Sequence, residues 1–275
     1  MEDLLAHPAI QGGIAPFVAA LILSLVFLRV NLLAGFILVA GFAIMVMMST
    51  GFSFSPLTST RKLSLCVLLI PVIAFLLHFS VKNSEHILKI SYGLIALAIV
   101  WILWPVIMRH SFAEVLIPVV GYIIYAAWMM SMFVRMSELP GITAGTSAFA
   151  TCMTIGGVAL IGASALLGQM GIAFGSAAAA FLLVQLLFQR DDLAGITFTM
   201  TSGLMTALLL PAAIVYAKVP WVVLPIVALI PLIAMYPFED ERLIWRNTIS
   251  LLAIIALPAG LALYLTWKSA GALLL

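Results

Sequence analysis

Hydroxyl side chains form the pattern in this sequence that is most suggestive of chemistry. They make two sets, Ser147, Thr151 and Thr154 in one apolar stretch and Thr199, Ser202 and Thr206 in another. The spacing of three or four residues places each set on one side of a helix. Two such stripes predict a pathway for a small neutral or amphipathic molecule. The alternative is that each hydroxyl bonds to carbonyls of its own helix or joins two helices.

Gln185 is an amide well inside a predicted membrane-spanning stretch, so it needs a partner on another helix or on a ligand. We include it in the candidate pathway with Thr151, Thr154, Thr199, Ser202 and Thr206.

A second pattern consists of small residues spaced four apart, Ser164 with Gly168 and Gly171 with Gly175. This spacing lets two helix backbones approach closely in a membrane. It predicts a helix-packing surface, which in a transport cycle would also be a surface that slides or rocks.

The usual catalytic constellations are missing from the sequence. No histidine follows His110 that could act as base for a serine nucleophile, no pair of carboxylates lies within an apolar stretch, and no glycine-rich phosphate loop precedes a lysine. The net charge of +2 comes without a basic block, which argues against nucleic acid as a partner. We therefore expect a protein that is not an enzyme and that has no cofactor and no metal.

The composition defines the solvent around the chain. Of 275 residues, 65% are hydrophobic and 8% are charged, and the mean hydropathy is +1.29. A soluble domain has about 25% charged residues, because its surface needs polar cover. The chain is therefore predicted to be an integral membrane protein whose main partner is the lipid bilayer. No linker divides it, so residues 1–275 are expected to form a single transmembrane domain.

The elements that must position the polar side chains are predicted to be helices. Runs that are apolar on all sides favour helices over barrel strands, and a helix needs about 20 residues to cross the hydrocarbon core. Ten stretches meet these requirements, at 13–30, 32–50, 63–80, 88–108, 115–134, 147–168, 170–189, 195–217, 219–237 and 247–267. Two joints between them, Arg29-Val30-Asn31 and Gly168-Gln169-Met170, are predicted to be tight turns.

An internal repeat is the predicted plan of this all-α bundle. A shift of 140 residues superposes the two tight turns, Arg29 on Gln169, and also aligns Gly35 with Gly175 and Pro71 with Pro211. Halves of five helices each, 1–134 and 135–275, would be inverted relative to one another, as in many transporters. The two termini are then expected on the same side of the membrane. Lysine and arginine divide five against seven between the two sides, so the orientation stays open.

Two functions are compatible with these patterns. The first is a secondary carrier or flippase-like transporter of a small neutral or amphipathic substrate. The bundle is similar in helix count and length to the drug/metabolite transporter superfamily, without a sequence motif of that family, so the likeness is one of topology. The second is a non-catalytic subunit or assembly scaffold of a larger membrane complex, with a membrane protein or a second copy as its partner. We expect a multi-pass protein of a bacterial cytoplasmic membrane.

Overall fold

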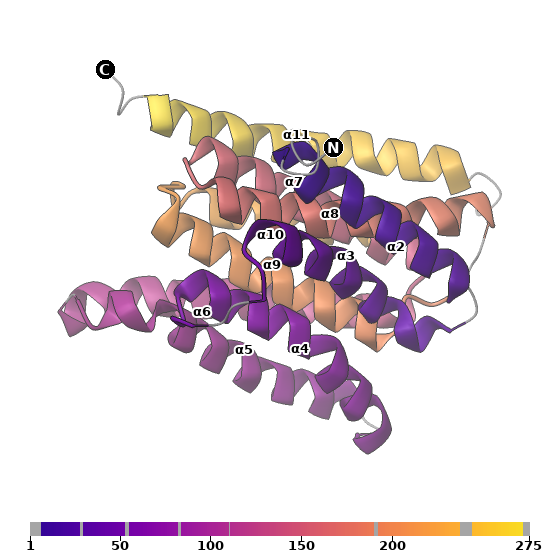
Figure 1. The fold of residues 1–275 in the computed structure, drawn as a ribbon, viewed down its shortest axis with the longest axis horizontal. Helices are drawn as coiled ribbons and strands as arrows, with labels where there is room; N and C mark the ends of the chain where they lie inside the picture. Colours follow the sequence, from indigo (N-terminus) through magenta and orange to yellow (C-terminus); the bar gives the residue numbers. More distant parts are fainter. Residues whose placement is uncertain are drawn as a thin grey trace.

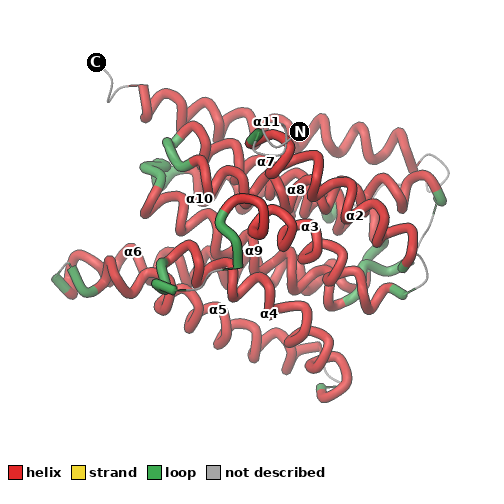
Figure 2. Tube along the Cα trace, in the orientation of Figure 1, coloured by secondary structure: helices red, strands yellow, loops and turns green. Residues whose placement is uncertain are grey.

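The computed structural model describes residues 7–27, 30–52, 55–81, 84–109, 111–189, 192–236 and 244–271. These residues form an all-helical bundle (Figure 1). Figure 2 shows helices joined by short loops, and within the ranges just given no strand is present. One isolated antiparallel β-bridge joins Pro140 to Leu193. The prediction of a helical membrane bundle is confirmed.

Ten helical stretches cross the bundle in chain order within the described part of the chain. The first half contains the π-turn Ile10–Ile14 continued by α2 (Ala15–Val26), then α3 (Ala34–Ser49), α4 (Ser59–Ser80), α5 (Ser84–Ile107) and α6 (Phe112–Arg135). The second half contains α7 (Gly141–Ile161), α8 (Ala165–Leu187), α9 (Ile196–Tyr216), α10 (Val223–Ala234) and α11 (Ile244–Gly271). Short 3₁₀ turns at Asn31–Leu33 and Met136–Glu138 precede α3 and α7.

Seven of these helices, α4 to α9 and α11, are long and apolar enough to cross a membrane. The protein is therefore a multi-pass integral membrane protein. The other three stretches are shorter, at Ile10–Val26, Ala34–Ser49 and Val223–Ala234. At 1.5 Å per residue the 12-residue α10 covers only about 18 Å of a hydrocarbon core that is about 30 Å thick.

Helix α9 is the centre of the molecule. In its most apolar 18 residues 94% are buried, compared with 22–33% in α4, α5, α6 and α11. In Figure 1, α11 lies along one edge of the bundle and α4, α5 and α6 along the opposite edge, with α9 between them. Helices α3, α4, α6 and α7 all pack on α9. The outer helices expose apolar side chains such as Ile117 and Leu257, as lipid-facing helices do.

The structure corrects one predicted turn. Gly168-Gln169-Met170 lies inside α8, and the chain turns instead at Gly162-Ala163-Ser164. Ala163 has a φ of +74°, and the Ser164 hydroxyl caps α8 by accepting the N–H of Leu167 at 3.4 Å. The helix predicted at 147–168 therefore begins six residues earlier and ends seven residues earlier, as α7. The helix predicted at 170–189 begins five residues earlier and ends two residues earlier, as α8.

The alignment that suggested a repeat loses its main anchor with this correction. Gln169 lies within α8, whereas Val30 lies between α2 and α3 and donates its N–H to the Phe27 carbonyl at 3.0 Å. Arg29 lies outside the described residues. Gly35 is the second residue of α3 and Gly175 the eleventh of α8, so the two are not equivalent. The predicted turns at Arg29 and Gln169 thus do not correspond to one another.

Candidate functional site

Helices α7 and α9 start side by side and run in the same direction. The Ala194 N–H donates to the Leu139 carbonyl at 3.0 Å, and the Gly195 N–H donates to the Ser137 carbonyl at 3.3 Å. The bridge between Pro140 and Leu193 joins the same two segments. Gly195, with a φ of +74°, then turns the chain into α9. The first residues of the two helices, Gly141 and Ile196, are therefore level.

Level starts bring the two hydroxyl stripes to the same depth. Ser147 and Ser202 are each the seventh residue of their helix, and Thr151 and Thr206 are each the eleventh. At 1.5 Å per residue these pairs lie about 9 Å and about 15 Å from the helix starts. The surrounding sequences share one pattern, Thr146-Ser147-x-x-x-Thr151 and Thr201-Ser202-x-x-x-Thr206. We call the stripes together the polar seam: Ser147, Thr151 and Thr154 on α7 and Thr199, Ser202 and Thr206 on α9.

Contacts on the other faces of both helices indicate which way the seam points. On α7, Gly156 faces α8 and Gly157 faces Leu263 of α11. Gly162, which directly follows α7 and continues the face of Ser147, Thr151 and Thr154, lies against the Ala217 carbonyl just beyond α9. On α9, Gly203 faces Met130 of α6, and Thr197 faces Gly35 of α3. The stripe that contains Ser202 points away from these contacts, toward the side where α7 packs.

Half of the seam hydroxyls bond to their own helix. Thr154 donates to the Ala150 carbonyl at 2.7 Å, Thr199 to the Gly195 carbonyl at 3.1 Å and Thr206 to the Ser202 carbonyl at 2.9 Å. Such bonds to the carbonyl four residues earlier are the ordinary arrangement for threonine in a membrane helix. These three residues, all predicted as pathway residues, therefore have local hydrogen-bond partners.

The other half of the seam has no hydrogen-bond partner. The hydroxyls of Ser147, Thr151 and Ser202 are fully buried and unpaired, and so is that of Thr146 beside them. A buried polar group without a partner costs about 1–3 kcal/mol. Because a hydroxyl both donates and accepts, these three, two at one level and Thr151 about one helical turn further along, could bind an uncharged polyol, amide or similar group. Ser147 belongs to the predicted stripe, whereas Thr146 was not predicted, although the repeated Thr-Ser-x-x-x-Thr pattern was a signal for it.

Gln185 lies apart from the deep part of the seam. It is third from the end of α8, and its amide carbon lies 3.4 Å from the position of a Cβ built on Gly141, the first residue of α7. The prediction that it is well inside a span is therefore wrong. Its side chain is 6% exposed and its Oε1 has no hydrogen-bond partner. It lies at the end of the bundle where α7 and α9 start.

The small residues lie where α7 and α8 touch. A Cβ added to Gly171 would lie 2.6 Å from the Gly156 Cα and 3.0 Å from the Cys152 carbonyl oxygen. A Cβ on Gly168 would meet Leu160, and one on Gly175 would lie 2.8 Å from Met153 Cγ. Ser164, predicted to share this helical spacing with Gly168, is instead the capping residue of α8. The contact is a tight backbone-to-backbone interface of the kind that small residues allow.

The cavities that the structure describes do not reach the seam. A cavity of about 420 Å³ lies between α4 and α5, and a smaller apolar space lies between α5 and α9 around Leu208 and Pro211. No seam residue lines either of them. Thr151, Thr199 and Ser202 are each 0% exposed, so α7 and α9 are closed on one another in this conformation.

The fold and the site define a class, that of all-helical multi-pass integral membrane proteins with a buried hydroxyl seam. No protein-family model and no curated protein sequence matches the chain.

Proposed function

We propose that the protein is a carrier for a small neutral or amphipathic molecule and that α7 and α9 separate to admit it. The observation that supports the proposal most is the set of three buried, unpaired hydroxyls at Ser147, Thr151 and Ser202. A static bundle gains nothing from them, because each costs stability without a partner. A substrate that hydrogen-bonds to them in an open conformation would supply the missing partners.

The substrate class follows from the chemistry of the seam. Hydroxyls and one amide carry no net charge, so they offer little to a simple ion. They suit a molecule with hydroxyl, carbonyl or amide groups and some apolar surface. The proposed protein is not an enzyme and needs no cofactor, and we place it in a bacterial cytoplasmic membrane.

One observation favours a second candidate, a non-catalytic subunit or scaffold of a larger membrane complex. The seam is fully closed around α9, as a scaffold with a packed centre would be. The scaffold hypothesis also predicts a glycine-rich groove free to dock a partner. The glycines at 168, 171 and 175 are instead occupied by α7 within the chain, so a docking partner would need another surface.

The experiment that separates the two candidates asks whether water reaches the seam. The native cysteines, Cys66 and Cys152, are first replaced by alanine. Ser202→Cys in that background is then exposed, in proteoliposomes, to a small water-soluble methanethiosulfonate. A carrier is expected to react at Ser202→Cys, because its seam opens during the cycle. Ala207→Cys, equally buried but on another side of α9, is the matched control and should stay unmodified.

Uptake measurements complete the test. Proteoliposomes are assayed with glycerol, urea, glucose and an amphipathic dye as probes. Thr151→Val together with Ser202→Ala should abolish uptake of any probe that the wild type carries, whereas Thr201→Val, whose hydroxyl bonds to the Thr197 carbonyl at 2.6 Å, should leave it unchanged. A Ser202→Cys variant that never reacts, in a protein that carries none of the probes, would contradict the carrier and favour the scaffold.

A further inference from the structure

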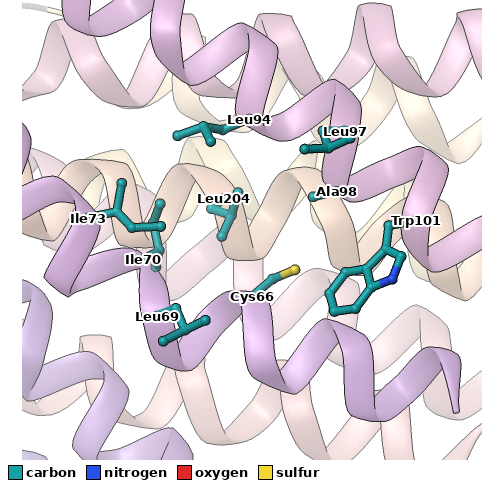
Figure 3. A pocket seen from close by; sticks show the side chains of 9 residues that line it. All are labelled: Cys66, Leu69, Ile70, Ile73, Leu94, Leu97, Ala98, Trp101 and Leu204. Atoms are coloured by element: carbon teal, nitrogen blue, oxygen red, sulfur yellow. The ribbon is translucent and has the colours of Figure 1, made fainter. Parts of the chain in front are cut away.

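The cavity between α4 and α5 is apolar and opens toward lipid. Its walls are aliphatic side chains of the two helices with Leu204 of α9 behind them, joined by Cys66 and Trp101 (Figure 3). Leu69 and Leu97, on opposite walls, are 55% and 68% exposed, so the opening lies on the outer surface of the bundle. In a membrane protein such an opening faces hydrocarbon chains.

A buried cation lies next to the cavity, against the Trp101 that lines one end of it. Lys62 is only 8% exposed, and its Nζ donates to the Trp101 carbonyl at 2.9 Å and lies 5.4 Å from the centre of the Trp101 ring, which itself lines the cavity. The ion pair that the described residues show is Lys89 with Glu85, and no acidic side chain among them pairs with Lys62. A buried ammonium without a counter-ion is costly, and two of its three N–H groups remain for an anion.

A proline creates this arrangement. Pro105 has no N–H, so the carbonyl four residues earlier, that of Trp101, lacks its helical donor. Lys62 supplies the donor from α4. At the next residue the Ile102 carbonyl accepts from the Ser59 hydroxyl at 2.9 Å and from the Tyr216 hydroxyl at 3.3 Å. A polar cluster from three helices, held by these hydrogen bonds, thus lies beside the Trp101 end of the cavity.

The level of Lys62 in the bundle matches that of a lipid headgroup. Lys62 is the fourth residue of α4, about 5 Å from the start of the helix. Trp104, Tyr216 and Trp221 lie at the same end of the molecule and are 37–48% exposed, as expected of aromatic side chains at a membrane interface. The apolar part of the cavity extends from there toward the membrane centre, over about 10 Å between Trp101 and Leu94.

We propose that this cavity binds an anionic phospholipid, with one acyl chain between α4 and α5 and the phosphate at Lys62. Charge complementarity selects the anion, because the lysine has no acid of its own. The lateral opening selects a molecule that is already dissolved in the bilayer. The site is independent of the proposed carrier activity, since Leu204 faces the cavity from the side of α9 opposite Ser202, about 200° around the helix.

Lipid selectivity tests the proposal. The full-length protein in detergent is incubated with phosphatidylglycerol or phosphatidylcholine of identical chains, and the bound lipid is quantified by native mass spectrometry. Wild type should bind phosphatidylglycerol about fivefold more tightly than phosphatidylcholine, because one basic residue near an anionic headgroup contributes about 1 kcal/mol. Lys62→Gln should remove the preference. Arg61→Gln, next in sequence but with its guanidinium bonded to the Pro56 carbonyl, is the control and should keep most of it.

Cys66 gives a second readout that does not depend on a lysine variant folding. Its thiol lines the cavity, so phosphatidylglycerol should slow its reaction with N-ethylmaleimide, whereas the fully buried Cys152 should stay unreactive throughout. Ala98→Phe fills the cavity and should abolish both lipid binding and this protection. Equal binding of the two lipids by wild type, or protection that survives Ala98→Phe, would overturn the proposal.

Discussion

Single side chains decide how closely α7 and α8 approach. Gly171 faces backbone atoms of Gly156 and Cys152, which cannot move aside as a flexible side chain can. Gly171→Ala should therefore lower the free energy of unfolding by about 1–3 kcal/mol through overpacking. Thermal unfolding in detergent measures the change. Gly260→Ala, in α11 with no atom within 4 Å of the added Cβ, is the control, and a loss of equal size there would argue against the packing explanation.

Replacing an unpaired seam hydroxyl by an apolar group should not lower the free energy of unfolding, unlike Gly171→Ala. Thr151→Val removes a buried hydroxyl that has no partner, so stability should stay the same or rise by about 1–3 kcal/mol. Thr154→Val removes a hydroxyl that bonds to the Ala150 carbonyl, and stability should stay the same or fall slightly. Denaturation by sodium dodecyl sulfate in mixed micelles compares the two. A marked loss of stability for Thr151→Val would mean that the hydroxyl already has a partner in the folded protein.

At the scale of elements, α5 depends on α4 through the carbonyl that Pro105 leaves without a donor. Lys62→Met alone should be destabilising, because the Trp101 carbonyl then has no donor. Pro105→Ala restores a backbone N–H to that carbonyl, so in its background Lys62→Met should cost about 1 kcal/mol less. A double-mutant cycle of unfolding free energies measures the coupling. Strictly additive effects would show that the proline and the lysine act separately.

The positions of the helices could be predicted from the sequence better than the turns between them. Hydropathy predicted ten membrane-spanning stretches; a helix lies at each of them, and seven of these helices are long and apolar enough to cross a membrane. It misplaced the turn between α7 and α8 at Gly168-Gln169-Met170, although the spacing of Gly168, Gly171 and Gly175 correctly predicted a close helix contact. Ser164 as a capping residue after Gly162 was the correct signal. The helix predicted at 63–80 also lacked its first turn. In the structure Thr58 caps a helix that starts at Ser59, so Lys62 is part of α4.

The polar stripes were also readable from spacing, but their pairing was not. Nothing in one sequence reveals that α7 and α9 start level, because this depends on hydrogen bonds from Ala194 and Gly195 to residues before α7. Which hydroxyls stay unpaired depends on side-chain rotamers in the packed bundle, so Thr151 and Thr154 could not be told apart beforehand.

At the scale of the whole molecule, the order of helices predicts which residues share a side of the membrane. Lys218 follows α9 and Lys268 lies near the end of α11, so cysteines at these positions should react with an impermeant maleimide from one side. If every helical stretch crosses the membrane, Lys89 follows three crossings and Tyr236 nine, so cysteines at these two positions should react from the other side. Oriented vesicles of a cysteine-free background provide the test. Labelling of Tyr236→Cys from the same side as Lys218→Cys would show that the short α10 does not cross.

The central position of α9 has a consequence for how the protein is made. Residues 196–216 leave the ribosome only after helices α2 to α8 have been made. Helices α3, α4 and α6, which pack on α9, are synthesised before it and enter the bilayer without the helix that joins them. Until then their inward faces contact lipid or the insertion machinery. A nascent chain that stalls before α9 can therefore form the contact between α7 and α8, but α3, α4 and α6 still lack the helix on which all three pack.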